Sequence, residues 1–198
     1  MIVRSDRILT LSVAASLLLL PLLGSAAARA DSQATTATAG QAPSAKPAYN
    51  PNIGTATGLP LPRFVSLRAD EVNLRVGPGD QYPILWVYHR VGLPVEILRE
   101  YDVWRLVIDS DGTKGWMHEA TLVGTRHFVI NGQQPVTLYR QPVGGSNPAA
   151  TLMPGVVGLI ERCNPPSDWC RVRAGHTGGW LKRTEFWGVL PGEKLPAK

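Results

Sequence analysis

From residue 63 onward, hydrophobic residues occur in short runs rich in β-branched and aromatic side chains. Examples are FVSL at 64–67, PVEIL at 94–98 and WRLVI at 104–108. Glycine, proline, asparagine and aspartate separate the runs, as in DSDG at 109–112, which indicates strands joined by tight turns. No long stretch of this region carries apolar residues at the spacing of an amphipathic helix between capping residues. The pattern predicts an all-β fold.

The predicted strands occur in two copies. Residues 72–78 (VNLRVGP) align with residues 136–142 (VTLYRQP) at an offset of about 64 residues. Each copy also contains two tryptophans about a dozen residues apart: Trp104 and Trp116 in the first, Trp169 and Trp180 in the second. The repeat is too long for one propeller blade or solenoid turn. We therefore expect two tandem small β-barrels, formed by residues 63–127 and 128–198.

A barrel of this size buries only about 60% of the surface of its unfolded chain, so its few large side chains must contribute strongly to stability. We expect the four repeated tryptophans to pack in the barrel cores, where each would bury a large apolar area. The alternative is that some of them stack on a ligand, and a tryptophan can do both.

The N-terminal residues resemble an export signal. Arg4 and Arg7 precede an apolar run at 8–23, and small residues follow. This order predicts a signal peptide at residues 1–30, cleaved before Asp31. The apolar run is shorter than the roughly 20 residues that span a bilayer, so we expect no stable membrane span after cleavage and a periplasmic or secreted product.

Residues 31–62 are dominated by serine, threonine, alanine, glutamine, glycine and proline, with Asp31 and Lys46 as the charged residues. Such a composition cannot form a hydrophobic core, which predicts a flexible, disordered linker. The formal net charge of the chain is +5. Its basic residues are scattered, and an exported protein meets little nucleic acid, so we expect no nucleic-acid partner.

Cys163 and Cys170 flank the predicted turn NPPSDW, between two strands of the second copy. In an exported chain, an even pair across a hairpin is expected to form a disulfide bond. Such a bond leaves no free thiol for nucleophilic catalysis.

The sequence does not match the motifs that we tested for metal binding, cofactor binding or catalysis. None of the four histidines is paired at zinc-binding spacing. A calcium loop starting at Asp109 would have Lys114 where glycine is needed and Ala120 where glutamate is needed. Gly77-Pro-Gly begins like a dinucleotide fingerprint, but Tyr82 replaces the third glycine. With no Gly-x-Ser-x-Gly sequence either, we expect a protein that is not an enzyme and uses no cofactor or metal.

Four segments together resemble the bacterial SH3-like (SH3b) domain: LRVGPG at 74–79, GLPVEIL at 92–98, WRLV at 104–107 and GWMH at 115–118. The resemblance covers about residues 65–195, twice. It implies a half-open barrel of short strands that binds peptidoglycan stem peptides, glycan or a protein segment in a shallow groove, and it does not imply catalysis. The second copy departs from the pattern, because Tyr-Arg-Gln at 139–141 replaces Arg-x-Gly.

An aromatic loop in the first copy is the candidate ligand groove. The candidate residues are Asp80, Gln81, Tyr82, Trp86, Tyr88 and Trp104. Aromatic walls with a few polar groups suit extended peptides and sugars. The alternative is that Tyr82, Trp86 and Tyr88 simply alternate along a strand, with one face in the core. The matching loop of the second copy, at 142–148, contains no aromatic residue, so we expect it to bind less well.

Together these features predict an exported, non-enzymatic SH3-like protein that recognises a peptidoglycan component or a segment of an envelope protein. The alternative is a structural scaffold that pairs with another chain by strand addition and has no cell-wall ligand. The sequence favours no particular oligomeric state.

Overall fold

The computed structural model of the chain describes residues 49–197. Within this range the fold is all-β, with strands in two antiparallel sheets and two short 3₁₀ helices, which confirms the predicted fold class. No helix of the described range is long and apolar enough to cross a membrane. The predicted signal peptide, and the predicted linker up to residue 48, lie outside the described residues.

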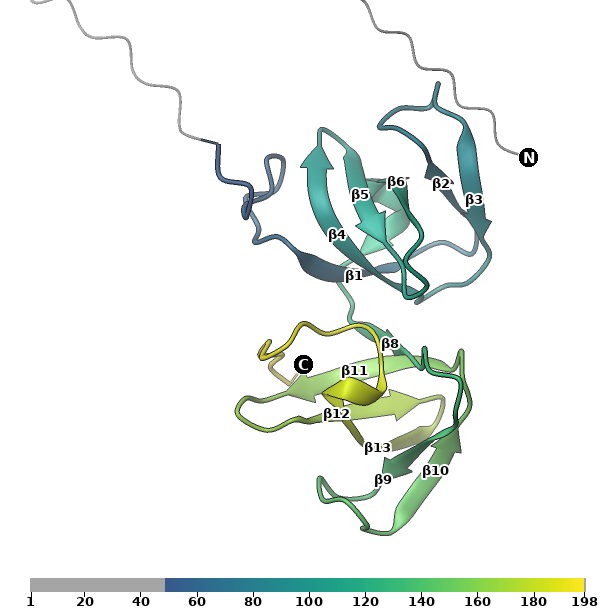
Figure 1. Cartoon of the computed structure of the whole chain (residues 1–198), viewed down its shortest axis with the longest axis vertical. Helices are drawn as coiled ribbons and strands as arrows, with labels where there is room; N and C mark the ends of the chain where they lie inside the picture. Colours follow the sequence, from purple (N-terminus) through teal and green to yellow (C-terminus); the bar gives the residue numbers. More distant parts are fainter. Residues whose placement is uncertain (1–48, 198) are drawn as a thin grey trace, which may run out of the picture. The chain divides into compact units, whose positions relative to one another are not determined.

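The first copy forms a seven-stranded sheet in the order β3-β2-β6-β5-β4-β1-β7 (Figure 1). Its elements are β1 (Arg63–Leu67), β2 (Val72–Arg75), β3 (Ile84–Tyr88), β4 (Pro94–Tyr101), β5 (Trp104–Ile108), β6 (Lys114–His118), η1 (Glu119–Thr121) and β7 (Leu122–Val123). Because strands β4, β5 and β6 are joined by tight turns, they form a continuous antiparallel meander.

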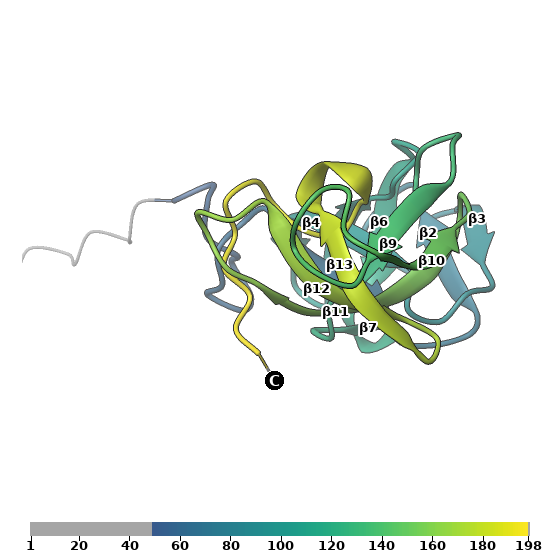
Figure 2. The same ribbon diagram turned by 90° about the horizontal axis from the view of Figure 1, so that it is seen from below.

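The second copy forms a six-stranded sheet in the order β10-β9-β13-β12-β11-β8. Its elements are β8 (His127–Val129), β9 (Val136–Tyr139), β10 (Pro148–Leu152), β11 (Val157–Cys163), β12 (Trp169–Ala174), β13 (Thr177–Lys182) and η2 (Arg183–Glu185). Figure 2 shows β11, β12 and β13 side by side. The order is that of β3-β2-β6-β5-β4-β1, and both meanders contain a bulge at the same place, so the two copies are built to one plan.

Each copy has its own hydrophobic core, in which glycines allow neighbouring strands to approach closely. A Cβ atom on Gly115 would lie 2.6 Å from Leu74 Cγ, and one on Gly179 would lie 2.5 Å from Leu138 Cγ. These are equivalent contacts in the two copies. The glycine of the Gly-Trp-aliphatic motif is therefore required because a leucine occupies the space of its missing side chain.

The prediction that the repeated tryptophans pack in the cores is wrong for three of the four. Trp104 is buried, but Trp116, Trp169 and Trp180 are only half-buried, and none of the four belongs to either core cluster. Side chains alternate along a strand, so the glycine and the aliphatic residue of the motif face inward and the tryptophan between them faces outward. Met117 and Leu181 fill the cores in their place.

The described structure begins before the predicted domain boundary at residue 63. Residues 50–62, which we call the N-terminal arm, contain a β-bridge between Ile53 and Pro60. Leu61 is buried in the core of the first copy. The backbone N–H groups of Ala56 and Thr57 donate to the carboxylate of Glu100, at 3.0 and 2.9 Å. The prediction of a flexible linker is thus wrong for this part, because a core leucine and a buried carboxylate hold it in place.

The two copies belong to one compact unit and contact each other directly. The rings of Phe64 and Trp187 meet edge to face, with centroids 4.9 Å apart. The buried hydroxyl of Ser66 donates to the backbone oxygen of Thr125 at 2.7 Å, and it lies 3.0 Å from Nδ1 of His127. The junction therefore combines aromatic packing with buried hydrogen bonds.

Candidate functional site

The loop between β2 and β3 is held in shape by Arg75. Its Nη1 donates to the backbone oxygens of Asp80 and Tyr82, at 3.1 and 2.8 Å. Its Nη2 lies 3.4 Å from Oδ1 of Asp80. The arginine of the Leu-Arg-Val-Gly-Pro-Gly motif therefore orders the loop that follows it.

Tyr82 lies directly against the backbone of this loop. A Cβ atom on Gly77 would be 2.5 Å from the ring of Tyr82, so only glycine allows the ring to pack there. The tyrosine remains 39% exposed. The loop backbone at Gly77 thus holds the ring of Tyr82 in place, while part of the ring stays open to solvent.

An exposed apolar surface surrounds Tyr82. Val76, Tyr82, Ile84, Leu85 and Trp86 are all between 39% and 59% exposed, and we call them the hairpin surface. Three consecutive residues of β3 are exposed, so both faces of this part of the strand are open to solvent. β3 is also the edge strand of its sheet, and no other strand within residues 49–197 pairs with its outer side (Figure 1). Exposed apolar clusters and free strand edges are typical of interaction sites.

The structure separates the predicted groove residues into two groups. Asp80, Gln81, Tyr82 and Trp86 are exposed on the β2–β3 hairpin. Tyr88 is buried, at 8% exposure, and so is Trp104, at 7%, so the prediction that they line an open groove is wrong. The alternative interpretation, an aromatic residue facing the core, is correct for Tyr88.

Both buried aromatic residues have structural partners. The hydroxyl of Tyr88 donates to Oδ2 of Asp109 at 2.6 Å, which ties β3 to the turn between β5 and β6. Burial raises the pKa of Tyr88, and the hydrogen bond to Asp109 raises it further. Trp104 packs edge to face on His118, with ring centroids 5.4 Å apart. The strand therefore becomes buried at Tyr88, and its exposed residues are the three at its beginning, Ile84, Leu85 and Trp86.

Sequence reasoning missed three members of the hairpin surface, namely Val76, Ile84 and Leu85. The run Ile-Leu-Trp at 84–86 was the available signal. A strand that is apolar at consecutive positions is either buried on both faces or, at a sheet edge, exposed for a partner.

The second copy lacks the hairpin surface. Tyr139 occupies the position of Arg75, because each is paired with the tryptophan of its Gly-Trp motif. The β9–β10 loop is held instead by a bond from Arg140 N to Asn147 O, at 3.0 Å. Its one exposed large hydrophobic residue is Val143, and it contains no aromatic side chain. The two copies therefore share a fold but not the hairpin surface.

Glu100 forms a buried anchor for the N-terminal arm. Its side chain has no exposure, and its carboxylate accepts bonds from Thr57 Oγ1 at 2.7 Å and Arg63 Nη2 at 2.5 Å, besides the backbone N–H groups of the arm. Arg105 Nε lies 3.7 Å away. Burial alone would raise the pKa of Glu100, but the bonds from Thr57, Arg63 and Ala56 lower it to about 2.

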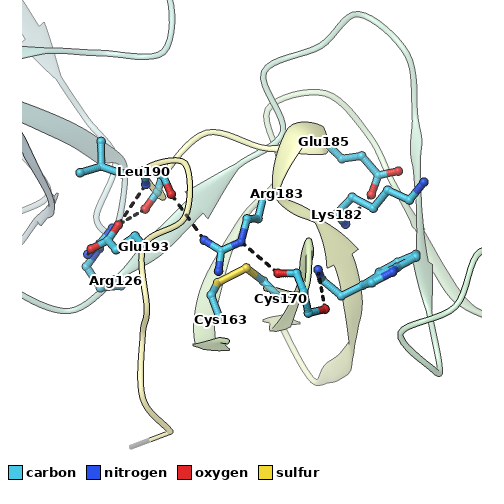
Figure 3. The surroundings of a disulfide bond; sticks show 11 residues. Arg126, Cys163, Cys170, Lys182, Arg183, Glu185, Leu190 and Glu193 are labelled. Carbon is cyan, nitrogen blue, oxygen red and sulfur yellow. Dashed lines mark hydrogen bonds and ion pairs between the residues drawn. A yellow bond between two sulfur atoms is a disulfide. The ribbon is translucent and has the colours of Figure 1, made fainter. Parts of the chain in front are cut away.

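The second copy has a disulfide bond at the equivalent position. Cys163 pairs with Cys170 across β11 and β12, as Glu100 pairs with Arg105 across β4 and β5. The disulfide is as predicted from the sequence. Cys163 also exchanges two backbone hydrogen bonds with Leu195, at 2.9 and 2.8 Å. This position thus holds the C-terminal segment in the second copy and the N-terminal arm in the first. Figure 3 shows the surroundings of the disulfide bond.

A groove of about 720 Å³ lies between the arm and the C-terminal segment. Its lining is largely apolar, with Leu59, Pro62, Leu122, Leu190 and Leu195 among its members. Charged side chains from both copies also line it: Arg63, Arg105, Glu119, Arg126 and Glu193. Within residues 49–197, no three histidine, cysteine or acidic side chains come together as metal ligands would.

Comparison with solved structures gives weak similarities. NlpC2 from Trichomonas vaginalis is 11% identical, over 65% of this chain and 48% of that chain, with a TM-score of 0.30. NlpC1 from the same organism is 10% identical, over 69% of this chain and 49% of that chain, with a TM-score of 0.31. This chain spans about half the length of these structures, and TM-scores this low support no conclusion.

The sequence comparison is informative. A search among curated proteins finds no match. The family described as Bacterial SH3 domain, however, matches residues 68–124 and again residues 132–188. The two matches follow the two sheets and together cover more than half of the sequence. The chain therefore belongs to the bacterial SH3 domain family.

Proposed function

We propose that this chain is an exported binding protein, without catalytic activity of its own, which holds an extended segment of peptidoglycan or of an envelope protein on its hairpin surface. Bacterial SH3 domains are modules that bind proteins or cell-wall components. The observation that carries the proposal is the exposed pair Tyr82 and Trp86 on an edge hairpin that Arg75 holds in shape.

The chemistry of the surface suits an extended ligand. Tyr82 and Trp86 offer large, stiff apolar area for sugar rings or side chains. The free edge of β3 offers backbone donors and acceptors to a peptide in extended conformation. Export is supported by the N-terminal sequence pattern and agrees with the Cys163–Cys170 bond, since disulfides persist in oxidising compartments.

A sedimentation assay with purified peptidoglycan tests the proposal. Trp86→Ala and Tyr82→Ala should each reduce the bound fraction by about fivefold or more, the usual effect of removing a central aromatic contact. Tyr101→Ala is the matched control, because Tyr101 is 60% exposed in the same copy but lies outside the hairpin surface. If both hairpin variants bind as well as the parent and the control, the hairpin surface is not the site.

A second candidate function is that of a scaffold which pairs with another protein chain. The free outer edge of β3 favours it, since a strand can be added there without any sugar ligand. Size-exclusion chromatography at low and high concentration distinguishes the two. Self-association, or a co-purifying partner, without binding to peptidoglycan would favour the scaffold.

A further inference from the structure

We propose that the outward face of the second sheet binds an acidic segment of a partner protein, in which aspartate or glutamate alternates with other residues. Residues 128–198 contain eight lysines and arginines against four acidic residues, whereas residues 63–127 contain eight against nine. Positive charge is therefore concentrated in the second copy. Part of it lies on one face of β11, β12 and β13, which we call the arginine face: Leu159, Glu161, Arg162, Arg171, Arg173 and Trp180.

Strand register and side-chain alternation bring the three arginines together. Arg162 lies opposite Arg171, and Arg173 lies two positions further along β12, on the same side of the sheet. The Cζ atoms of Arg162 and Arg171 lie 5.2 and 5.8 Å from the centre of the Trp180 ring. A hollow of about 330 Å³ is lined by the three arginines and by Leu159. The face therefore combines a cluster of guanidinium groups with a concave surface.

The positive charge of the arginine face is open to solvent and only partly neutralised. Glu161 is its one acidic residue, and its carboxylate lies 2.5 Å from Arg173 Nη2 and 3.5 Å from Arg171 Nε. The side chains of these two arginines stay 52% and 34% exposed. Arg162 is exposed and forms no ion pair within residues 49–197. One carboxylate thus faces three guanidinium groups, which leaves two positive charges for a ligand.

The fold does not require arginine at these positions. Leu106 takes the place of Arg171 in the first copy, because each is paired with the tryptophan of its Gly-Trp motif. Ile108 corresponds to Arg173, since each lies two positions further along its strand. The first copy forms the same strand order with apolar residues there. The charge is thus a property of the surface of the second copy and not of the shared fold.

The spacing of the arginines suits an extended acidic peptide. Residues two apart on a strand lie about 6.8 Å apart and point to the same side. Arg171 and Arg173 have this spacing, and a peptide with acids at alternate positions presents its carboxylates in the same way. The planar guanidinium group matches the geometry of a carboxylate and can donate two hydrogen bonds to it. Clusters of arginine are a recurring means of recognising acidic segments.

Two other anionic partners match the face less well. Single-stranded nucleic acid is bound by stacking bases on open aromatic rings, but two guanidinium groups lie over the Trp180 ring. A membrane surface is bound by inserting exposed apolar side chains. Among the described residues of the second copy, the large exposed hydrophobic residues are Val143 and Met153, and neither belongs to the arginine face.

Fluorescence anisotropy on the full chain tests the proposal. The probe is a labelled twelve-residue peptide in which glutamate alternates with threonine. A peptide with glutamine in place of every glutamate should bind about tenfold more weakly or less, because it cannot form charge-assisted hydrogen bonds. In ¹H–¹⁵N spectra, the acidic peptide should shift the indole N–H signal of Trp180 and not that of Trp116, its equivalent in the first copy.

Arg162→Gln should weaken binding of the acidic peptide about fivefold, the effect of losing one partly exposed charge contact. This arginine is exposed and has no ion pair, so its replacement leaves the fold intact. Arg99→Gln is the matched control, because Arg99 is exposed at the equivalent position of the first copy and the substitution removes the same charge. The control should bind the peptide like the parent.

Glu161→Gln should act in the opposite direction. Removing this carboxylate frees two arginines, so the acidic peptide should bind about threefold more tightly. Trp86→Ala should leave the affinity for the peptide unchanged, because the arginine face shares no residue with the hairpin surface. A failure of the proposed function would therefore leave this result intact, and the reverse also holds.

Three results would overturn the proposal. The first is equal weakening by Arg162→Gln and Arg99→Gln, since binding would then follow the net charge of the chain. The second is a loss of affinity, or no change, in Glu161→Gln. The third is that a twelve-nucleotide oligothymidine or a phosphatidylglycerol vesicle binds more tightly than the peptide and loses affinity in Arg162→Gln, which would assign the arginine face to another partner.

Discussion

Replacing Glu100 by glutamine removes the charge that anchors the N-terminal arm. The pKa of this carboxyl is about 2, against an ordinary value of 4.5, although burial works in the opposite direction. The side chain of Glu100 has no exposure to solvent. At 1.36 kcal/mol per pKa unit, the lowered pKa corresponds to about 3 kcal/mol of the free energy of unfolding. The variant should therefore be less stable than the parent by about 3 kcal/mol at pH 7, since it leaves Arg63 and Arg105 without a buried counter-charge.

The sign of the pH dependence follows from the lowered pKa. Below pH 4.5 the unfolded chain takes up a proton at this position while the folded chain does not, so the folded state loses stability as the pH falls. The contribution of Glu100 should be fully present above about pH 5 and mostly lost by about pH 2. The difference between parent and Glu100→Gln should shrink accordingly.

Urea unfolding between pH 2 and pH 7 measures this difference. Amide signals of β4 and β5 report on the first copy separately from the second. Glu161→Gln is the control, because Glu161 pairs with Arg173 at 2.5 Å, but the arginine is 52% exposed, and such pairs contribute about 1 kcal/mol or less. A difference for Glu100→Gln that is as small as that of the control, or that stays constant from pH 7 to pH 2, would refute the reasoning.

Three further variants can be checked by the same unfolding assay. Cys163→Ser with Cys170→Ser should destabilise the second copy by about 2.5 kcal/mol, as expected for a short closed loop, and reductant should add nothing to it. Tyr88→Phe should cost about 1–3 kcal/mol, because buried Asp109 loses its hydroxyl donor. Gly115→Ala should cost about 1–3 kcal/mol by forcing two strands apart. An unchanged urea midpoint would contradict the respective argument.

The fold was predictable because its determinants are local. Turn residues and short β-rich runs repeat at the same spacing in both copies, and the structure has the same strand order in each. The inward-facing residues were harder to assign. In Gly115-Trp-Met, the tryptophan has the largest side chain and is therefore the residue that one expects in the core. Because side chains alternate along a strand, Gly115 and Met117 face the core and Trp116 faces outward.

The ordered arm and the groove could not be predicted, because both depend on contacts between distant residues. Thr57 and Glu100 are 43 residues apart, and Arg126 and Glu193 are 67 apart, with no periodic pattern to connect them. The binding role of Asp80, Gln81, Tyr82 and Trp86 stays a prediction.

Equivalent positions of the β4–β5 and β11–β12 hairpins are joined in different ways. In the first copy Glu100 and Arg105 form an ion pair, and in the second copy Cys163 and Cys170 form a disulfide bond. The N-terminal arm should therefore be sensitive to acid, and the C-terminal segment to reducing agents. Acid neutralises Glu100 and loosens the beginning of the described chain, whereas a thiol reductant opens the cystine and loosens its end. A difference at one pair of equivalent positions thus gives the two ends of the described chain different sensitivities.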